Sequence, residues 1–133
     1  MKLVTLTDGG SRGNPGPAAI GVVIKNTAGH IVAGYGEYIG HATNNVAEYS
    51  ALISALKKAL ALGATEVECK MDSMLVAEQM NRHWKVKNAH IQKLFIEAWN
   101  AAAVFKKISF KHIRREYNTE PDAWVNKALD ARK

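Results

Sequence analysis

The chain has 133 residues, 47% hydrophobic and 23% charged, which suits a single hydrophobic core and excludes a disordered composition. It contains one cysteine, Cys69, and no apolar run near the roughly 20 residues that span a bilayer, so an internal disulfide, a cysteine-rich metal site and a membrane segment are excluded. The net charge of +6 favours a polyanionic partner without identifying it, and the absence of a signal-peptide pattern predicts a cytoplasmic protein.

Three strands are predicted at the start of the chain, at residues 2–7, 18–26 and 31–39, where apolar and β-branched residues concentrate. Between the first two lies the segment Asp8-Gly9-Gly10-Ser11-Arg12-Gly13-Asn14-Pro15-Gly16-Pro17. Its glycines allow the backbone to approach a ligand closely, and its prolines stiffen it. Taken alone, this composition is also typical of a surface turn after a strand.

Helices and strands are predicted to alternate along the rest of the chain. A long helix is predicted after Thr43-Asn44-Asn45, with Gly63 as its stop. Further helices cover residues 73–81, 90–105 and 119–131, and the strands cover residues 66–71 and 107–113. The resulting order, βββ-α-β-α-α-β-α, contains no repeat or linker. It predicts an α/β fold for a single domain over residues 1–133, with one five-stranded mixed sheet flanked by helices.

Four acids stand at the boundaries of these predicted elements: Asp8, Glu48, Asp72 and Asp122. Each has a local alternative, since Asp72 could cap the helix that follows it, Asp122 could form a capping box with Thr119, and the helix dipole favours Glu48. Ligand sites of mixed sheets gather at strand ends, and acids clustered there repel one another unless cations neutralise them. Oxygen ligands of this kind favour Mg²⁺ or Mn²⁺.

Five motifs follow one another along nearly the whole chain. They are the Asp8–Pro17 segment, Thr43-Asn44-Asn45-Val46-Ala47-Glu48-Tyr49, Met71-Asp72-Ser73, Trp84-Lys85-Val86-Lys87-Asn88, and Arg115-Glu116-Tyr117-Asn118 leading to Asp122-Ala123. Together they resemble the type 1 ribonuclease H family. The resemblance implies the ribonuclease H-like fold and endonucleolytic hydrolysis of the RNA strand of RNA/DNA hybrids, leaving a 3′-hydroxyl and a 5′-phosphate.

The resemblance also implies a catalytic role for Asp8, Glu48, Asp72 and Asp122, which would bind two Mg²⁺ ions, with Mn²⁺ as the alternative. Asp8 would bridge both ions, Asp122 would help hold the ion that activates water, and the other two acids would hold the ion at the leaving oxygen. Such a pair of metals can serve both ends of an in-line displacement.

Substrate contacts are implied by the same resemblance. They fall on Gly9, Gly10, Ser11, Asn14, Thr43, Asn44, Asn45, Trp84, Lys85 and Lys87. Asparagine suits a contact with the ribose 2′-hydroxyl because its amide both donates and accepts. Thr43-Asn44-Asn45 is equally compatible with a helix cap, and Trp84 with a packing role, whereas Trp99 and Trp124 are interpreted as structural residues.

The chain departs from the family pattern at two places. Some members carry an extra helix and a basic loop that grips the hybrid, but this chain passes directly from Asn81 to Trp84, which leaves the source of its substrate affinity open. Many members also place a histidine in a mobile loop before the last acid. Here either His112, at the predicted end of a strand, or Arg115 would take that role in turnover.

Two functional alternatives stay open at this point. One is a nuclease of the same fold that also cuts double-stranded RNA, and the other is a hybrid-binding module without catalysis. The presence of all four acids argues against the second. No membrane contact and no obligatory protein partner are expected.

Overall fold

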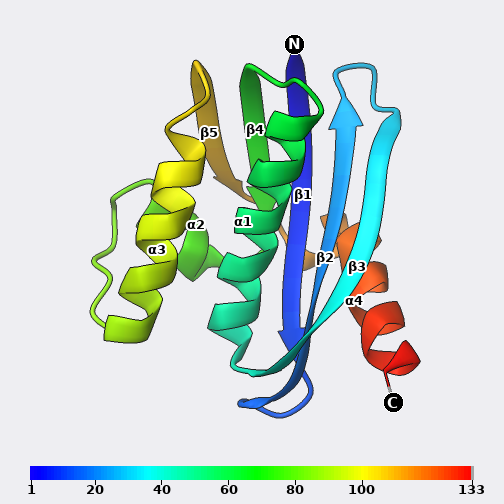
Figure 1. Ribbon diagram of the computed structural model, residues 1–133, viewed down its shortest axis with the longest axis vertical. Coiled ribbons are helices and arrows are strands. Elements are labelled where there is room, and N and C mark those ends of the chain that lie inside the picture. Colours follow the sequence, from blue (N-terminus) through cyan, green and yellow to red (C-terminus); the bar gives the residue numbers. More distant parts are fainter. Residues whose placement is uncertain (133) are drawn as a thin grey trace.

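A five-stranded mixed sheet runs through the computed structural model, which describes residues 1–132 (Figure 1). Its strands are β1 (Lys2–Ser11), β2 (Gly16–Asn26), β3 (Ile31–Ala42), β4 (Glu66–Met71) and β5 (Lys107–His112). The spatial order is β3-β2-β1-β4-β5, with β1 antiparallel to β2 and parallel to β4. The predicted order of elements and the mixed sheet are therefore confirmed.

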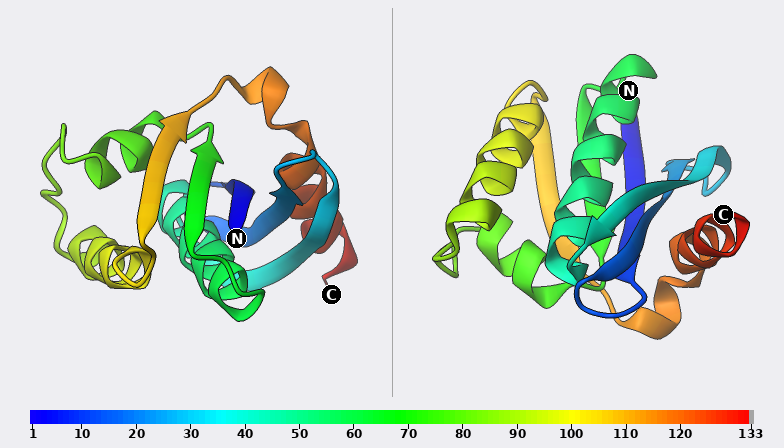
Figure 2. Two further views of the ribbon diagram at one scale, coloured as in Figure 1. Left: turned by 90° about the horizontal axis from the view of Figure 1, so that it is seen from above. Right: turned by 60° about the horizontal axis from the view of Figure 1, so that its bottom comes forward.

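Four helices cover the two faces of this sheet: α1 (Asn44–Ala61), α2 (Met74–Met80), α3 (Ala89–Ala102) and α4 (Thr119–Ala131). Helices α1 and α3 lie on one side, and α4 lies across β2 and β3 on the other, as the two views of Figure 2 show. Along residues 1–132, none of the helices combines the length and the apolar character needed to cross a membrane.

The larger hydrophobic core lies between α1, α3 and the sheet. Tyr49, Leu52 and Leu56 are buried on one face of α1 because they recur at helical spacing. Leu60 shares the spacing but keeps 50% of its surface exposed, since it lies in the last turn. A second core on the opposite face joins Val125 of α4 and its neighbours to β2.

The first strand is longer than predicted. Residues 9–11 continue the pairing with β2, from Gly9 opposite Ile20 to Ser11 opposite Ala18. Their glycine-rich composition suggests a turn, but pairing with β2 and side-chain acceptors on α1 together engage their backbone groups. Asp8 therefore lies inside β1, and the prediction that it ends the strand is wrong.

Hydroxyl side chains, and not the acids, cap the helices beside the sheet edge. Thr43 and Ser73 accept hydrogen bonds from backbone nitrogens in the first turns of α1 and α2. The cap predicted for Thr43 is thus confirmed, and Asp72 is free of a capping role because the next residue performs it. Thr119 is already the first residue of α4 and does not form the capping box considered for Asp122.

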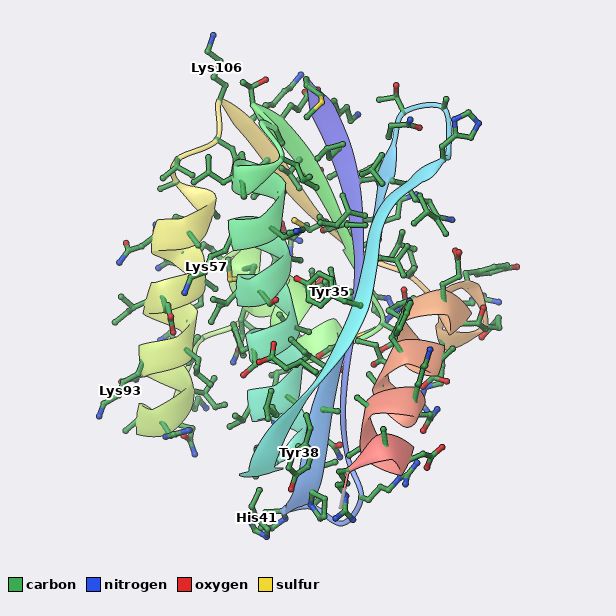
Figure 3. The ribbon with its side chains drawn as sticks, turned by 45° about the vertical axis from the view of Figure 1, so that its right-hand side comes forward. Tyr35, Tyr38, His41, Lys57, Lys93 and Lys106 are labelled. Carbon is green, nitrogen blue, oxygen red and sulfur yellow. The ribbon has the colours of Figure 1, made fainter. Side chains whose placement is uncertain are left out.

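The third strand is tied to α1 by a side-chain hydrogen bond. The Tyr35 hydroxyl lies 2.6 Å from Ser54 Oγ, and burial raises the pKa of the tyrosine. Figure 3 shows Tyr35 turned toward α1, whereas Lys93 and Lys106 point away from the body of the molecule. The edge strand β3 is in this way fixed to the helix that begins at the candidate site.

Candidate active site

Gly9 allows the first turn of α1 to lie directly against β1. A Cβ atom at this position would overlap the carbonyl of Ala47 and the backbone nitrogen of Glu48. The Gly9 backbone nitrogen donates a hydrogen bond of 2.5 Å to Glu48 Oε1, which turns the glutamate toward the sheet. The close approach permitted by glycine therefore brings Glu48 beside Asp8.

Three carboxylates converge at this point. Oxygen atoms of Asp8, Glu48 and Asp72, from β1, α1 and the end of β4, lie within 4.8 Å of one another. Asp8 is only 8% exposed, and burial, together with the nearby charges of Asp72 and Asp122, raises its pKa to about 7. Burial and the charge of Asp8 also raise the pKa of Glu48 well above its usual value. Charged acids are unfavourable in such a cluster without a cation.

The donor set suits a hard divalent cation. Three carboxylates offer oxygen ligands at a cleft that is also lined by backbone of residues 9–11. Mg²⁺ and Mn²⁺ favour such ligands, and their positive charge would stabilise the ionised forms that burial disfavours. The predicted metal-binding character of this cluster is supported by its geometry, without fixing the number of ions.

Asn118 connects the cluster to the interior. Its side chain is fully buried, and its Nδ2 donates to the Thr7 carbonyl at 2.8 Å and to Asp72 Oδ2 at 3.4 Å. Its Oδ1 has no hydrogen-bond partner among the residues that the structure describes. Asn118 therefore holds the start of α4 against β1 and orients Asp72.

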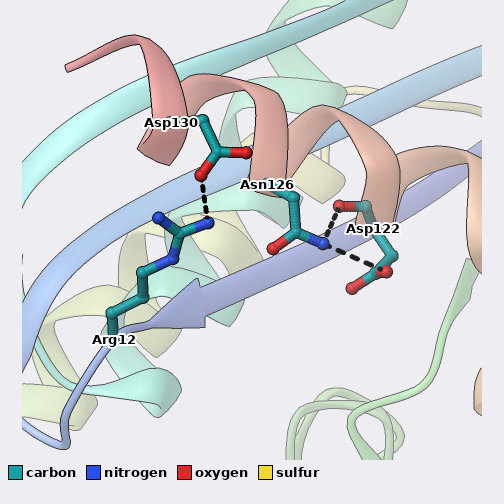
Figure 4. Close-up of polar contacts among 4 residues, drawn as sticks. All are labelled: Arg12, Asp122, Asn126 and Asp130. Carbon is teal, nitrogen blue, oxygen red and sulfur yellow. Dashed lines mark hydrogen bonds and ion pairs between the residues drawn. The ribbon is translucent and has the colours of Figure 1, made fainter.

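Asp122 lies on the wall of the same cleft, on the first turn of α4. Asn126, one turn later, donates through Nδ2 to the carbonyl oxygen and to Oδ2 of Asp122, at 3.2 and 3.4 Å (Figure 4). An exposed ion pair of 2.6 Å between Arg12 and Asp130 links the loop after β1 to the same helix. The fourth predicted acid thus borders the three-carboxylate cluster.

Amide side chains join the glycine-rich segment to the start of α1. The Ser11 backbone nitrogen donates to Asn44 Oδ1 at 2.8 Å, and the Asn44 backbone nitrogen donates to Asn14 Oδ1 at 3.1 Å. Both amide oxygens are therefore engaged, while no partner is found for either Nδ2 group within residues 1–132. Gly10, Ser11, Asn44 and Asn45 line the cleft beside the acids.

A neighbouring groove contains most of the remaining predicted contact residues. It is lined by Asn14, Thr43 and Asn45 on one side and by Lys85 and Lys87 on the other. Asn45 also lines the acidic cleft, so the two hollows are neighbours.

Trp84 keeps 46% of its surface exposed and lines a third hollow, of which Lys85 is also part. It is therefore accessible to a ligand on one face, while the rest of its surface is covered by the protein. Trp124 packs against Gly34 and Gly36 of β3, as a structural residue does, whereas Trp99 is 40% exposed.

The two candidates for turnover are placed differently. Arg115 lines the acidic cleft, from the short 3₁₀ turn at Arg115–Tyr117. His112 ends β5, as predicted, and is exposed outside the residues that line the cleft. Of the two, only the arginine side chain belongs to the wall around the acids.

Two site residues had no assigned role in the sequence interpretation. Asn126 could have been found from its position four residues after Asp122, which places both on one face of a helix. Asn118 carries no such local signal, because its partners are 111 and 46 residues away in the chain.

Comparison with known proteins identifies the relatives of this chain. The family profile described as "Reverse transcriptase-like" matches residues 6–128. The bifunctional protein Rv2228c of Mycobacterium tuberculosis is 49% identical over 133 residues, which are 98% of this chain and 36% of that protein. The chain therefore spans about a third of the length of that relative.

Two solved structures are similar in sequence and in fold. The crystal structure of RNase H1 from the halophilic archaeon Halobacterium salinarum is 40% identical, with a TM-score of 0.97 over 99% of this chain and 100% of that one. LC11-RNase H1, solved in complex with an RNA/DNA hybrid, is 42% identical, with a TM-score of 0.92 over 96% of each chain.

Proposed function

Because the chain belongs to the type 1 ribonuclease H family, we propose that it hydrolyses the RNA strand of RNA/DNA hybrids as a metal-dependent endonuclease. The observation that carries the proposal is the convergence of Asp8, Glu48 and Asp72 within 4.8 Å at a cleft rich in backbone and amide donors. The RNA/DNA hybrid bound to the similar LC11-RNase H1 supports this choice of substrate.

We propose Asp8, Glu48, Asp72 and Asp122 as the ligands of two Mg²⁺ ions, with Mn²⁺ as a substitute. Bound there, the ions would lower the pKa of a water molecule and neutralise charge on the departing 3′ oxygen, so that the products carry a 3′-hydroxyl and a 5′-phosphate. Asp8 is suited to bridging because it is the least exposed of the three converging acids and interacts with Glu48, Asp72 and Asp122 alike.

The side chains of the site hold a proton and orient the acids. The raised pKa values of Asp8 and Glu48 mean that this pair retains a proton near neutral pH, which it must release before both carboxylates can act as ligands. Asn118 and Asn126 keep Asp72 and Asp122 in place through their amide donors. Arg115, on the cleft wall, is the better placed residue to handle phosphate during turnover.

We propose that the side-chain amides of Asn14 and Asn44 distinguish the RNA strand of the hybrid from the DNA strand. With their oxygens engaged inside the protein, Asn14 and Asn44 present Nδ2 donors to the minor groove, where the ribose 2′-hydroxyl and base acceptors lie. Gly9, Gly10 and Ser11 bring backbone to the same edge. Thr43, Lys85 and Lys87 line the neighbouring groove and suit the backbone of the DNA strand.

The test is a cleavage panel with labelled RNA/DNA hybrid, RNA duplex and DNA duplex, each in Mg²⁺, Mn²⁺ or EDTA. We expect cleavage of the hybrid that requires a divalent ion and leaves the DNA duplex intact. Cleavage of the RNA duplex at a similar rate would identify the broader nuclease, and hybrid binding without cleavage in either metal would identify the binding module.

A further inference from the structure

A groove lies between α3 and the connector that follows α2, residues 81–88, and only its residues Trp84 and Lys85 have been connected to the substrate so far. It is lined by Arg82, His83, Trp84, Lys85, Val86, Gln92, Phe95 and Ile96. Its walls combine aromatic rings with cations, and Trp84 and Ile96 are among its exposed members. This composition is typical of surfaces that bind a nucleic-acid strand.

Arg82 occupies an unusual backbone conformation in this groove. Its φ angle is +64°, and it is the sole residue other than glycine with a positive φ in residues 1–132. The position follows Asn81, the C-cap of α2, and glycine is the residue that adopts this conformation there without steric cost. An arginine at such a position is strained, which suggests that its side chain has a function.

The side chain of Arg82 is held by two aromatic rings of α3. Its Cζ lies 5.7 Å from the ring centroid of Phe95 and 5.5 Å from that of Trp99, and the two rings stack 5.8 Å apart. A guanidinium group that stacks through its face keeps its N–H edge available, and that edge matches the geometry of phosphate.

The surroundings favour an anion. Within residues 1–132, no carboxylate forms an ion pair with Arg82, and Glu78, a nearby acid, is engaged by His83 at 3.0 Å. Lys85 lines this groove and also the groove that meets the acidic cleft at Asn45. The two grooves therefore meet at Lys85, and a strand long enough to reach both would pass this residue.

We propose that Arg82, braced by Phe95 and Trp99, binds a backbone phosphate of the hybrid and extends the substrate interface beyond Trp84, Lys85 and Lys87. The proposal rests on the proposed function, since it names a further contact for the same substrate. It also supplies a source of affinity in a chain that lacks the basic loop of some family members, because the connector places Arg82 against α3, where Gln92 also donates to the Val86 carbonyl.

Arg82→Gly is an informative variant because it separates binding from folding. Glycine removes the guanidinium and its contacts with Phe95 and Trp99 but relieves the steric cost of the positive φ, so these effects oppose each other and the thermal midpoint should change little. Arg82→Lys keeps the charge and loses the planar fork. Lys106→Ala, at the far end of the molecule in Figure 3, removes one positive charge away from the groove and is the matched control.

The measurement is hybrid binding by fluorescence anisotropy in EDTA, as a function of salt concentration, with the whole chain. We expect Arg82→Gly to weaken binding by roughly threefold to tenfold and to lower the slope of log K against log salt by about 0.9, the loss of one phosphate contact. Arg82→Lys should retain most of the slope, and Lys106→Ala should retain both the affinity and the slope.

An affinity and a slope unchanged by Arg82→Gly would overturn the inference, as would an equal effect of Lys106→Ala. If Arg82→Gly weakens binding and also lowers the thermal midpoint, the salt slope of Arg82→Lys decides. A slope close to that of the unchanged protein would support the inference, and a slope as low as that of Arg82→Gly would overturn it. The proposed function is judged separately: failure of the unchanged protein to cut the hybrid in Mg²⁺ would refute catalysis, while the salt slope in EDTA would still decide the role of Arg82. No hybrid binding at all would overturn both.

Discussion

Replacing Asp8 by asparagine should abolish cleavage and, in the metal-free protein, increase stability. Asp8 is nearly buried, and its carboxyl group lies beside Glu48 and Asp72. Asparagine keeps the size of the side chain, removes one charge from a repulsive cluster and can donate a hydrogen bond to Glu48. It cannot replace a carboxylate that bridges two cations.

The size of the expected change in the free energy of unfolding follows from the pKa of Asp8. The group titrates near 3.8 in the unfolded chain and near 7 in the folded, metal-free protein. Between these values the folded state binds a proton that the unfolded state has released, so stability falls as the pH rises and the full loss is reached above pH 7. At about 1.4 kcal/mol per pKa unit, the loss is at most about 4 kcal/mol, part of which Glu48 shares.

The assay is urea unfolding in EDTA at pH 5 and pH 8. Asp8→Asn should be more stable than the unchanged protein by about 1 to 4 kcal/mol at pH 8, and by less at pH 5. Asp130→Asn is the matched control, because it removes the same charge from an exposed ion pair and should change stability by less than about 1 kcal/mol.

Added Mg²⁺ should stabilise the unchanged protein, since a cation that binds only the folded state shifts the folding equilibrium toward that state. The difference in stability between the unchanged protein and Asp8→Asn should therefore become smaller. An Asp8→Asn protein that is less stable than the unchanged protein at pH 8 would refute the repulsion argument. Substantial cleavage by Asp8→Asn would refute the assignment of Asp8 as the bridging ligand.

Three further substitutions test how the site is built. Asn118→Ala should cost about 1 to 3 kcal/mol in urea unfolding, because the Thr7 carbonyl loses its buried donor, and an unchanged stability would contradict the role of that bond. Gly9→Ala should cost about 1 to 3 kcal/mol and sharply reduce cleavage, because its Cβ displaces the start of α1; full activity would show that Glu48 need not lie there. Asn45→Ala should lower the preference for hybrid over DNA duplex in competition binding while stability changes by no more than about 0.5 kcal/mol, and loss of stability with unchanged preference would indicate a structural role.

The fold was largely predictable because its elements carry strong local signals. Strand β4 and helix α4 begin and end at the predicted residues, since alternation and helical spacing are clear there. The end of β1 was not predictable, because Gly9 and Gly10 have the composition of a turn and become a strand only through pairing with β2. Such pairing depends on residues further along the chain, which local composition does not reveal.

The site was predictable to the extent that its residues have recognisable chemistry. Acids at element boundaries indicated Asp8, Glu48 and Asp72, and the structure brings them together. The contribution of Asn118 depends on contacts with Thr7 and Asp72 that only the folded chain creates. The basic residues around Trp84, Arg82 among them, indicated nucleic acid, but nothing in the sequence signals the positive φ of Arg82 or its contacts with α3.

The most direct test of the metal-dependent active site is a strand-specific cleavage assay on one RNA/DNA hybrid labelled differently on its two strands. We predict that in Mg²⁺ the RNA strand is cut internally to fragments with 3′-hydroxyl and 5′-phosphate ends, that the DNA strand stays intact, and that EDTA or Asp8→Asn stops the reaction. RNA cleavage that persists in EDTA, or that yields 2′,3′-cyclic phosphate ends, would contradict the proposal that the carboxylate cluster acts through divalent cations.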